Sequence, residues 1–245
     1  MRAAPDGYTL LLATQNQVVT NPMLYPKLTF DTVKDLMPVS LVSAQANILV
    51  VNNDVPAKTV RGLVALARAQ PGAFTFASGG VGTSQHLAGE LLKSMARIDI
   101  RHVPYRGMAL AVPDLLAGRI TMMVSSSNIA LPQVREGKLR ALAVTSRQRL
   151  RELPDVPTVA ESGFPGFDAA PWFGLMAPAG TSTHVIERLH RETMKLLTLP
   201  GVLKKFDELG MWAVGGTPAE FKRTIQADIP VLRKVIDDSR MQPTE

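Results

Sequence analysis

The sequence predicts an α/β protein built from two lobes, and three observations lead to this prediction. Short apolar runs alternate with helix-patterned segments through the middle of the chain, which is typical of βαβ units and a parallel sheet. Strand and helix patterns also occur on both sides of this section, so the two ends of the chain would together form the other lobe. A chain of 245 residues is long enough for two modest domains. We expect lobe 1 in residues 1–42 plus 172–245, lobe 2 in residues 43–171, and a ligand cleft between the lobes.

The first part of lobe 1 is expected to contain strands and a short helix. A buried strand is predicted over residues 8–13, and the polar cluster Thr14-Gln15-Asn16-Gln17 follows at its end. Asp31 is placed to cap a short helix. Two extended pieces follow over residues 39–43 and 48–51, and the first crossing between the lobes is expected near them.

Lobe 2 is predicted to alternate strand and helix. Its predicted strands cover residues 74–77, 100–103, 120–124 and 139–145, and its predicted helices begin after Thr59, after Thr83 or Ser84 and at Met108, while a fourth reaches Arg135. Right-handed crossovers bring the carboxyl ends of parallel strands to one edge of a sheet. The loops that follow these strands should therefore converge.

The last part of the chain is predicted to return to lobe 1. The expected elements are a strand over residues 172–177, helices over 183–199 and 200–210, a short strand over 212–214 and a final helix from Thr217. Thr217, Pro218 and Glu220 carry the signature of a capping box with proline in the first turn.

Composition and charge exclude several classes of protein. Cysteine is absent, so disulfides and thiolate nucleophiles are excluded. No apolar run is long enough to cross a bilayer, so direct membrane insertion is not expected, and the first residues lack the apolar region of a signal peptide. The net charge is +6, and the densest basic run, residues 135–151, contains no aromatic residue that could stack on a base. We interpret that run as a solvated face and expect no nucleic-acid partner.

The rest of the chain is organised around the stretch from Phe74 to Leu92. After the apolar strand, Ser78-Gly-Gly-Val-Gly leads into a helix, so several backbone N–H donors and a positive helix end would face one point, as in an anion site. Both phosphate motifs fail, because no Gly-Lys-Ser/Thr ends the loop and Gln85 stands where the dinucleotide fingerprint needs glycine. A small carboxylate fits this loop better than a nucleotide does. The alternative is a turn that only packs a helix against a strand.

Three further polar segments follow predicted strand ends, namely Tyr105–Gly107, Ser125–Asn128 and Thr145–Ser146. Ligands of open α/β sheets bind outside the carboxyl ends of the strands. The repetition of polar loops at these positions favours a binding site over a packing turn.

Other chemistry is weakly indicated. The four histidines lack metal-ligand spacing, so we expect no metal and no cofactor. His102 is expected to be an ordinary strand residue. His86 could contact a ligand or pack against neighbouring side chains. Arg106 could hold a carboxylate through two hydrogen bonds or stay exposed in a turn. No Gly-x-Ser-x-Gly elbow occurs and no Ser, His and Asp can be grouped from sequence, so no catalytic residue is assigned and an enzyme is not expected.

Several segments in a fixed order resemble the Bug family, the extracytoplasmic solute receptors of tripartite tricarboxylate transporters. The resemblance covers essentially the whole chain and is carried by Pro5-Asp-Gly-Tyr-Thr-Leu-Leu, Asn21-Pro-Met-Leu-Tyr, Ser78-Gly-Gly-Val-Gly-Thr-Ser-Gln-His-Leu-Ala-Gly-Glu, Val103-Pro-Tyr-Arg-Gly, Gly137-Lys-Leu-Arg-Ala-Leu-Ala-Val-Thr-Ser, Leu153-Pro-Asp-Val-Pro-Thr-Val-Ala-Glu-Ser-Gly and Trp172-Phe-Gly-Leu-Met-Ala-Pro.

The resemblance implies a type II periplasmic-binding-protein fold that closes on a small organic carboxylate and presents it to membrane transporter subunits in the periplasm. It also implies a ligand held by backbone and hydroxyl hydrogen bonds. Together with the polar loops, it gives the expected ligand-binding residues, which are Thr14, Asn16, Ser78, Gly79, Gly80, Thr83, Ser84, His86, Tyr105, Arg106, Gly107, Ser125 and Ser126.

The chain departs from the family pattern in two places. Family members begin well before Pro5, with a signal peptide, a first strand and a first ligand loop, so lobe 1 is expected to be truncated at its N-terminus. The family also commonly has an Asp after the strand that ends here at Val124, whereas this chain has Ser125-Ser126-Ser127-Asn128. Loss of that carboxylate should shift selectivity away from ligands with an amino group.

Three functions are therefore kept as hypotheses. The leading one is a solute-binding receptor for a small carboxylate. The alternatives are an α/β enzyme that acts on such a carboxylate and a ligand-sensing module for signalling.

Overall fold

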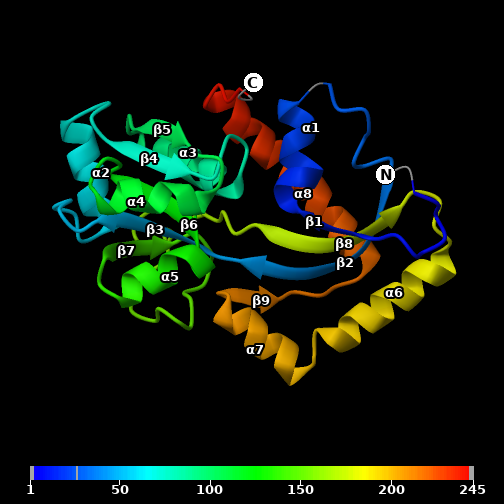
Figure 1. Ribbon diagram of the computed structural model, residues 1–245. Coiled ribbons are helices and arrows are strands. Elements are labelled where there is room, and N and C mark those ends of the chain that lie inside the picture. The colour runs from blue at the N-terminus through cyan, green and yellow to red at the C-terminus, as the bar shows by residue number, and fades with distance from the viewer. Residues whose placement is uncertain (1–2, 26, 243–245) are drawn as a thin grey trace. The chain divides into compact units, whose positions relative to one another are not determined.

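The computed structural model describes residues 3–25 and 27–242 and divides into two compact units. Unit 1 comprises Met1–Ala44 and Pro171–Lys234, and unit 2 comprises Gln45–Ala170 and Val235–Glu245. Each unit contains its own β-sheet with helices beside it (Figure 1). The predicted α/β class is thus confirmed, whereas the predicted lobe boundaries and the cleft stay a prediction.

The sheet of unit 1 has four strands in the order β1-β8-β2-β9. Their bounds are Leu11–Thr14 for β1, Trp172–Pro178 for β8, Leu36–Gln45 for β2 and Met211–Ala213 for β9. Both β1 and β2 run antiparallel to β8. Gly174 on β8 is required by packing, because a Cβ there would lie 2.1 Å from the ring of Phe221 on α8.

The helical elements of unit 1 mostly follow the sequence pattern. They are a π-helical turn η1 (Asn16–Thr20), α1 (Asn21–Leu24), α6 (Thr183–Leu196), α7 (Pro200–Glu208) and α8 (Pro218–Asp238), the last of which runs on into unit 2. The capping box of α8 is confirmed, because Thr217 N–H donates to Glu220 Oε2 at 2.7 Å and Glu220 N–H donates to Thr217 Oγ1 at 3.2 Å.

Two predictions for unit 1 were wrong. The strand expected over residues 8–13 covers only Leu11–Thr14 and lies at the sheet edge, so Tyr8 is 93% exposed and Leu12 59%. The helix expected after Asp31 is a turn. The Asp31 carboxylate accepts from the N–H groups of Val33 and Lys34 at 2.9 and 3.1 Å, but Leu36 already pairs with β8, so the chain continues as a strand.

The sheet of unit 2 has five strands in the order β5-β4-β6-β3-β7. Their bounds are Arg101–Pro104 for β5, Thr75–Ser78 for β4, Met122–Ser126 for β6, Asn47–Asn52 for β3 and Leu139–Val144 for β7. The strands of the predicted βα section run parallel, as expected, because β4 is parallel to β5 and β6, and β7 runs in the same direction. The sheet is nevertheless mixed, because β3, for which no direction was predicted, runs antiparallel to both β6 and β7. β3 directly follows β2 of unit 1 along the chain, and no βα crossover joins it to its sheet neighbours β6 and β7. The local sequence pattern therefore does not set its direction.

Apolar clusters cover both faces of this sheet. Leu49 and Val51 pack into one cluster, while Ile48 and Val50 pack into the other, as expected from the two-residue repeat of a strand. All six residues of β3 are buried, which explains why the four residues between its two terminal asparagines are all apolar.

The helices of unit 2 lie near their predicted positions. They are α2 (Val60–Ala69), α3 (Ser84–Ala96), a 3₁₀ turn η2 (Met108–Ala111), α4 (Val112–Leu116) and α5 (Ser127–Arg135). Thr59 caps α2 and Thr83 caps α3 through their side-chain oxygens, as predicted. The single helix expected over residues 108–117 is divided, because Pro113 has no N–H to continue an α-helix that began at Met108.

Candidate functional site

The ends of five strands meet at one edge of the unit 2 sheet. Strands β4, β5, β6 and β7 run in the same direction, so their carboxyl ends share this edge. Because β3 runs the opposite way, its first residue, Asn47, lies at the same edge and pairs with Ser126 at the end of β6. The structure therefore brings together the predicted loops of unit 2, and it adds Asn47.

The glycine-rich loop after β4 is fixed by its own hydroxyl groups. Gly80 and Gly82 have φ of 128° and 77°, which side-chain-bearing residues rarely adopt. The Ser78 hydroxyl accepts from Gly80 N–H at 3.2 Å and donates to Gly80 O at 3.0 Å, while Thr83 Oγ1 donates to Gly80 O at 2.7 Å. The loop is thus a defined turn.

Two backbone donors at the start of α3 remain available for an anion. His86 N–H donates to the Thr83 cap at 3.4 Å, and Gly82 N–H donates to His86 Nδ1 at 3.3 Å. By contrast, the N–H groups of Ser84 and Gln85 have no acceptor among residues 3–25 and 27–242. Because α3 is a 13-residue helix, its N-terminal dipole adds to the attraction of these donors for negative charge.

Asn47 connects this loop to the neighbouring strands, and sequence reasoning missed it. Its side chain donates to Ser84 Oγ at 3.5 Å and accepts from Gln85 Nε2 at 3.3 Å. Its backbone N–H donates to Thr145 Oγ1 at 3.0 Å. The signal available in the sequence was an amide residue directly before the apolar run from Ile48 to Val51.

The second loop, residues 105–107, begins with a side chain that already has a partner. Tyr105 N–H donates to Ser78 O at 3.0 Å, and its hydroxyl donates to Asp114 Oδ2 at 2.6 Å. Burial and the Asp114 carboxylate raise the pKa of Tyr105 to about 12. Arg106 is exposed and makes no hydrogen bond or ion pair within the described part of the chain. Gly107 has φ of 111° and shapes the turn into η2.

The third loop, after β6, has one partly accessible serine. Ser125 is fully buried and donates to Ser126 O at 3.3 Å, whereas Ser126 is half-buried. Ser127, which begins α5, donates to Ala46 O at 2.8 Å and so connects this loop to the residue that precedes Asn47. Two serine hydroxyls are therefore used inside the protein.

A group of buried and half-buried ionisable side chains lies behind the glycine-rich loop. His86 on α3 and His102 on β5 stack with ring centroids 3.7 Å apart, and His102 Nε2 is hydrogen-bonded to Ser78 Oγ at 2.6 Å. Burial, above all, lowers the pKa of His102 to about 3, so the ring stays neutral. Burial alone would raise the pKa of Glu90, but the contacts with His86 and Lys93 outweigh it and leave that pKa below its usual value.

The Ser78–His102 pair has the distance of a nucleophile and its base. However, Ser78 is fully buried, and its hydroxyl is also bonded to Gly80 in its own loop. This environment fits a structural hydroxyl, and His102 is more than the ordinary strand residue that the sequence led us to expect.

The remaining predicted site residues, Thr14 and Asn16, lie in unit 1. Thr14 Oγ1 donates to Asn16 Oδ1 at 2.6 Å where β1 ends. The next segment is held by Asp228 on α8, whose Oδ2 accepts from Gln15 Nε2 and from Trp172 Nε1, both at 2.7 Å. Asp228 is a further residue that sequence reasoning missed.

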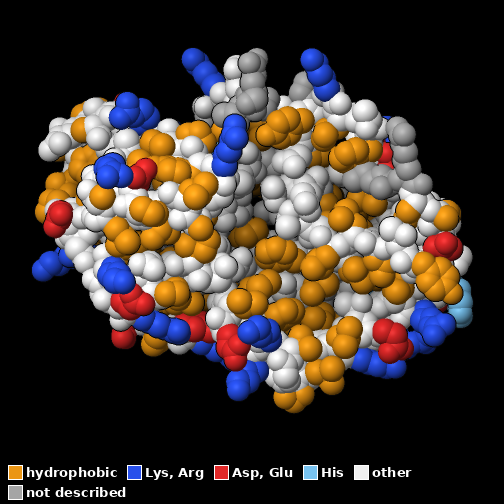
Figure 2. All heavy atoms as spheres, in the orientation of Figure 1, with side chains coloured by type: hydrophobic (Ala, Val, Ile, Leu, Met, Phe, Trp, Pro, Cys, Tyr) orange, Lys and Arg blue, Asp and Glu red, His pale blue; other side chains and the backbone are white. Residues whose placement is uncertain are grey.

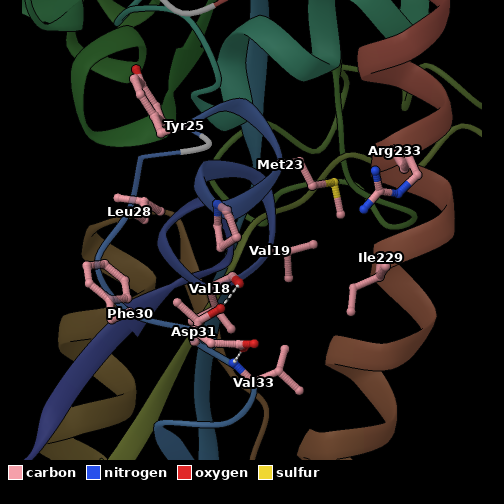
Figure 3. A pocket seen from close by; sticks show the side chains of 12 residues that line it. Val18, Val19, Met23, Tyr25, Leu28, Phe30, Asp31, Val33, Ile229 and Arg233 are labelled. Carbon is pink, nitrogen blue, oxygen red and sulfur yellow. Dashed lines mark hydrogen bonds between the residues drawn. The ribbon is translucent and has the colours of Figure 1, made fainter.

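Unit 1 also contains two pockets, of about 300 and about 570 Å³. Figure 3 shows the smaller one, which is lined mainly by apolar side chains such as Val19, Met23 and Ile229, with Arg233 on α8 beside them. Among the described residues, none of the predicted ligand residues lines either pocket. The candidate site is therefore the strand edge of unit 2.

The basic run between Arg135 and Arg151 is largely paired. Arg147 contacts Asp168 at 2.7 Å, and Arg149 contacts Glu161 at 2.9 Å. On the face in Figure 2, basic side chains are scattered and many lie close to acidic ones.

In the residues that the structure covers, no cluster of three or more acidic or histidine side chains could hold a metal ion. No helix in the described ranges has the length and apolar character needed to span a membrane.

Comparison with known proteins places this geometry in a family context. The family model described as "Tripartite tricarboxylate transporter family receptor" matches residues 1–241. The UPF0065 protein in the tcbD-tcbE intergenic region of Pseudomonas sp. (strain P51) is 37% identical over 245 residues, which cover 100% of this chain and 73% of that protein. Protein BugT of Bordetella pertussis is 35% identical over 229 residues, or 93% of this chain and 70% of BugT.

Solved structures agree with these matches. The structure of Rpa4515 of R. palustris with adipate superimposes with a TM-score of 0.89 at 31% identity, covering 99% of this chain and 81% of that one. The periplasmic binding protein BugD gives a TM-score of 0.84 at 27% identity, covering 99% and 82%. MatC (Rpa3494) from Rhodopseudomonas palustris with bound malate gives 0.81 at 28% identity, covering 96% and 81%.

Proposed function

This chain belongs to the receptor family of the tripartite tricarboxylate transporters, and from that premise we propose that the glycine-rich loop of unit 2 binds the carboxylate of a small organic acid. Members of this family are solute-binding receptors. We propose further that the protein acts in the periplasm and presents its ligand to the membrane subunits of such a transporter.

One observation carries the proposal for the site. The free N–H groups of Ser84 and Gln85 lie at the positive end of α3, beside the side-chain amides of Asn47 and Gln85. These groups are hydrogen-bond donors without a full positive charge, which suits a carboxylate that must later be released. The net charge of +6 also favours the approach of anions.

The structural relatives support the class of ligand. Rpa4515 was solved with adipate and MatC with malate, and both ligands are small dicarboxylates. The loop from Ser125 to Asn128 contains no carboxylate that could pair with an ammonium group. We therefore propose a carboxylic acid without an amino group. Besides Ser84, the proposed contacts in unit 2 include Gly79, Gly80, Thr83, Arg106, Gly107 and Ser126. Ser78 and Ser125 are fully buried and Tyr105 donates its hydroxyl to Asp114, so we propose that these three side chains shape the site. Thr14 and Asn16 in unit 1 stay predicted contacts.

The test is a thermal-shift and titration-calorimetry screen with adipate, malate, citrate, an aromatic acid and an amino acid. A ligand at one hundred times its Kd should stabilise the protein by about 2.7 kcal/mol. Gly79→Asp should weaken binding about tenfold or more, because it puts a negative charge beside that of the ligand. A Cβ at Gly79 meets its nearest atom at 3.5 Å, so the substitution fits sterically.

One control and one further test variant make the result specific. Gly79→Asn has nearly the same shape without the charge and should bind close to wild type. Ser84→Asp should also weaken binding, although an acidic residue in the first turn of α3 stabilises the helix by about 0.3–1 kcal/mol. Unchanged affinity in both aspartate variants would refute the proposed site.

A further inference from the structure

Two imidazoles from different elements, the buried His86 and the half-buried His102, form one stack under the glycine-rich loop. The rings of His86 and His102 are nearly parallel, with an interplanar angle of 12° and centroids 3.7 Å apart. His102 also packs on Phe76 of β4, with centroids 4.8 Å apart. Thus β4, α3 and β5, which surround the loop, each contribute one ring.

Each imidazole is bonded to a different arm of the loop. His102 Nε2 is hydrogen-bonded to Ser78 Oγ, and this hydroxyl in turn holds both the N–H and the carbonyl of Gly80. His86 Nδ1 accepts from Gly82 N–H at 3.3 Å. The two positive-φ glycines of the loop are therefore each fixed through a histidine.

The orientation of His86 is set from its other side. Because Nδ1 accepts a hydrogen bond, the ring proton of the neutral form is on Nε2, which lies 3.7 Å from Glu90 Oε1. Glu90 is itself paired with Lys93 at 2.8 Å, and its side chain is only 7% exposed. The carboxylate thus favours the tautomer that leaves Nδ1 free to accept from Gly82.

We propose that His86 and His102 are positioning residues that hold the glycine-rich loop in its ligand-binding conformation without contacting the ligand. The proposal rests on the function proposed above, and it gives His86 a different role from the ligand contact expected from the sequence. His86 is 5% exposed and both of its ring nitrogens face protein groups. Glycine loses more conformational freedom than other residues when it is ordered, so a loop held in advance binds more tightly than a free one.

The first experiment is a double-mutant cycle read out by calorimetry with adipate and malate as probes. His102→Phe keeps a ring for stacking but cannot bond to Ser78, and Ser78→Ala removes the partner. His102→Phe should bind about tenfold more weakly, which corresponds to one lost hydrogen bond, and Ser78→Ala, which also loses both bonds to Gly80, should bind at least as weakly as His102→Phe. If His102 acts through Ser78, the double variant should bind no more weakly than Ser78→Ala alone. Additive losses, or unchanged affinity in His102→Phe, would overturn the proposal.

Conservative substitutions should restore binding, and each histidine requires a different one. Gln places its amide near the position of Nε2, so His102→Gln should bind close to wild type. Asn places its amide near the position of Nδ1, so His86→Asn should bind more tightly than His86→Phe. His184→Phe, at an exposed position on α6 of unit 1, is the control and should leave affinity unchanged.

Amide hydrogen exchange separates this proposal from the proposed function. If the wild type binds neither probe, adipate and malate are excluded as ligands, but the loop can still be examined. Exchange of the Gly80 amide should accelerate in His102→Phe, and exchange of the Gly82 amide should accelerate in His86→Phe, while amides in the centre of β6 keep their rates. Unchanged exchange at both glycines would refute the positioning role regardless of ligand.

Discussion

Asn47 and Thr145 exchange two hydrogen bonds at the edge of the unit 2 sheet, although 98 residues separate them in the chain. Asn47 N–H donates to Thr145 Oγ1 at 3.0 Å, and Thr145 N–H donates to Asn47 O at 2.9 Å. The side chain of Asn47 also reaches Ser84 and Gln85 at the start of α3. One amide residue therefore connects β3, the end of β7 and the proposed anion site.

The cap of α3 should contribute to both stability and binding. Thr83→Ala removes the oxygen that accepts from His86 N–H and the hydroxyl that donates to Gly80 O. The free energy of unfolding should fall by about 1 kcal/mol, as for other lost N-caps. Binding of adipate or malate should weaken as well, because the first turn of α3 carries the proposed donors. Urea titration and calorimetry would measure the two effects.

The matched control for this cap lies in unit 1. Ser182 caps α6 by accepting from Val185 N–H at 3.4 Å, so Ser182→Ala should cost similar stability. It should not change affinity, since α6 carries none of the proposed ligand residues. Equal loss of affinity in both variants would mean that stability alone controls binding.

Gly89 in α3 should tolerate no side chain. A Cβ at this position would lie 2.3 Å from the Phe76 ring, which is fully buried. We expect Gly89→Ala to lower the free energy of unfolding by about 1–3 kcal/mol, the cost of overpacking a core, despite the better helix propensity of alanine. Urea unfolding followed by circular dichroism would give this value.

Two further variants show whether the clash is the cause. Gly201→Ala in α7 introduces the same methyl group into open space and should be neutral or stabilising by up to about 1 kcal/mol. Phe76→Leu should cost less in the Gly89→Ala background than in wild type. If Gly89→Ala is as stable as wild type, the close contact with Phe76 does not constrain the helix.

His102 should make the protein less stable in mild acid. Burial is the main reason that its pKa falls from 6.5 to about 3 in the folded state, so the unfolded chain binds the extra proton first as the pH falls. Stability should therefore decrease as the pH falls below roughly 6.5, and the loss should continue toward pH 3. From about pH 7 to about pH 5 the linkage relation gives at most about 2 kcal/mol, and allowance for partial solvent exposure reduces this to about 1 kcal/mol.

The measurement compares urea unfolding of wild type and His102→Gln at both pH values. The difference in stability between the two proteins should change by about 1 kcal/mol over this range. The lowered pKa of Glu90 is common to both proteins, so its contribution cancels in this difference. A difference that does not change with pH would show that His102 is protonated equally easily in the folded and unfolded states.

The sequence predicted most local structure of unit 2, because strand, loop and cap signals agree there. Thr59 and Thr83 cap the expected helices, and Gly80 and Gly82 adopt the positive φ values that a glycine-rich turn suggests. Asp31 shows where local signals fail, because its capping geometry forms but Leu36 is held in β2 by pairing with β8. The direction of β3 was also outside the reach of local patterns, since pairing with β6 and β7 determines it.

Only the part of the candidate site that local sequence encodes could be predicted. The glycine-rich loop could be found because its residues are consecutive. Asn47 and His102 could not, because one reaches the loop through an antiparallel strand and the other through a stack with His86. Contacts of this kind depend on the register between strands, which no short segment encodes.

The hydrogen bonds of Thr145 also bear on how unit 2 is inserted in the chain. Besides its bonds to Asn47, Thr145 accepts from Ala169 N–H at 2.9 Å and donates through its hydroxyl to Ala169 O at 3.3 Å. The segment from Gln45 to Ala170 therefore begins and ends against the same residue. A segment whose two ends meet can be exchanged between related proteins as a cassette, because its replacement leaves the spacing at the junctions unchanged. Recombination of ligand loops within the family would thus be possible without rebuilding the sheet of unit 1.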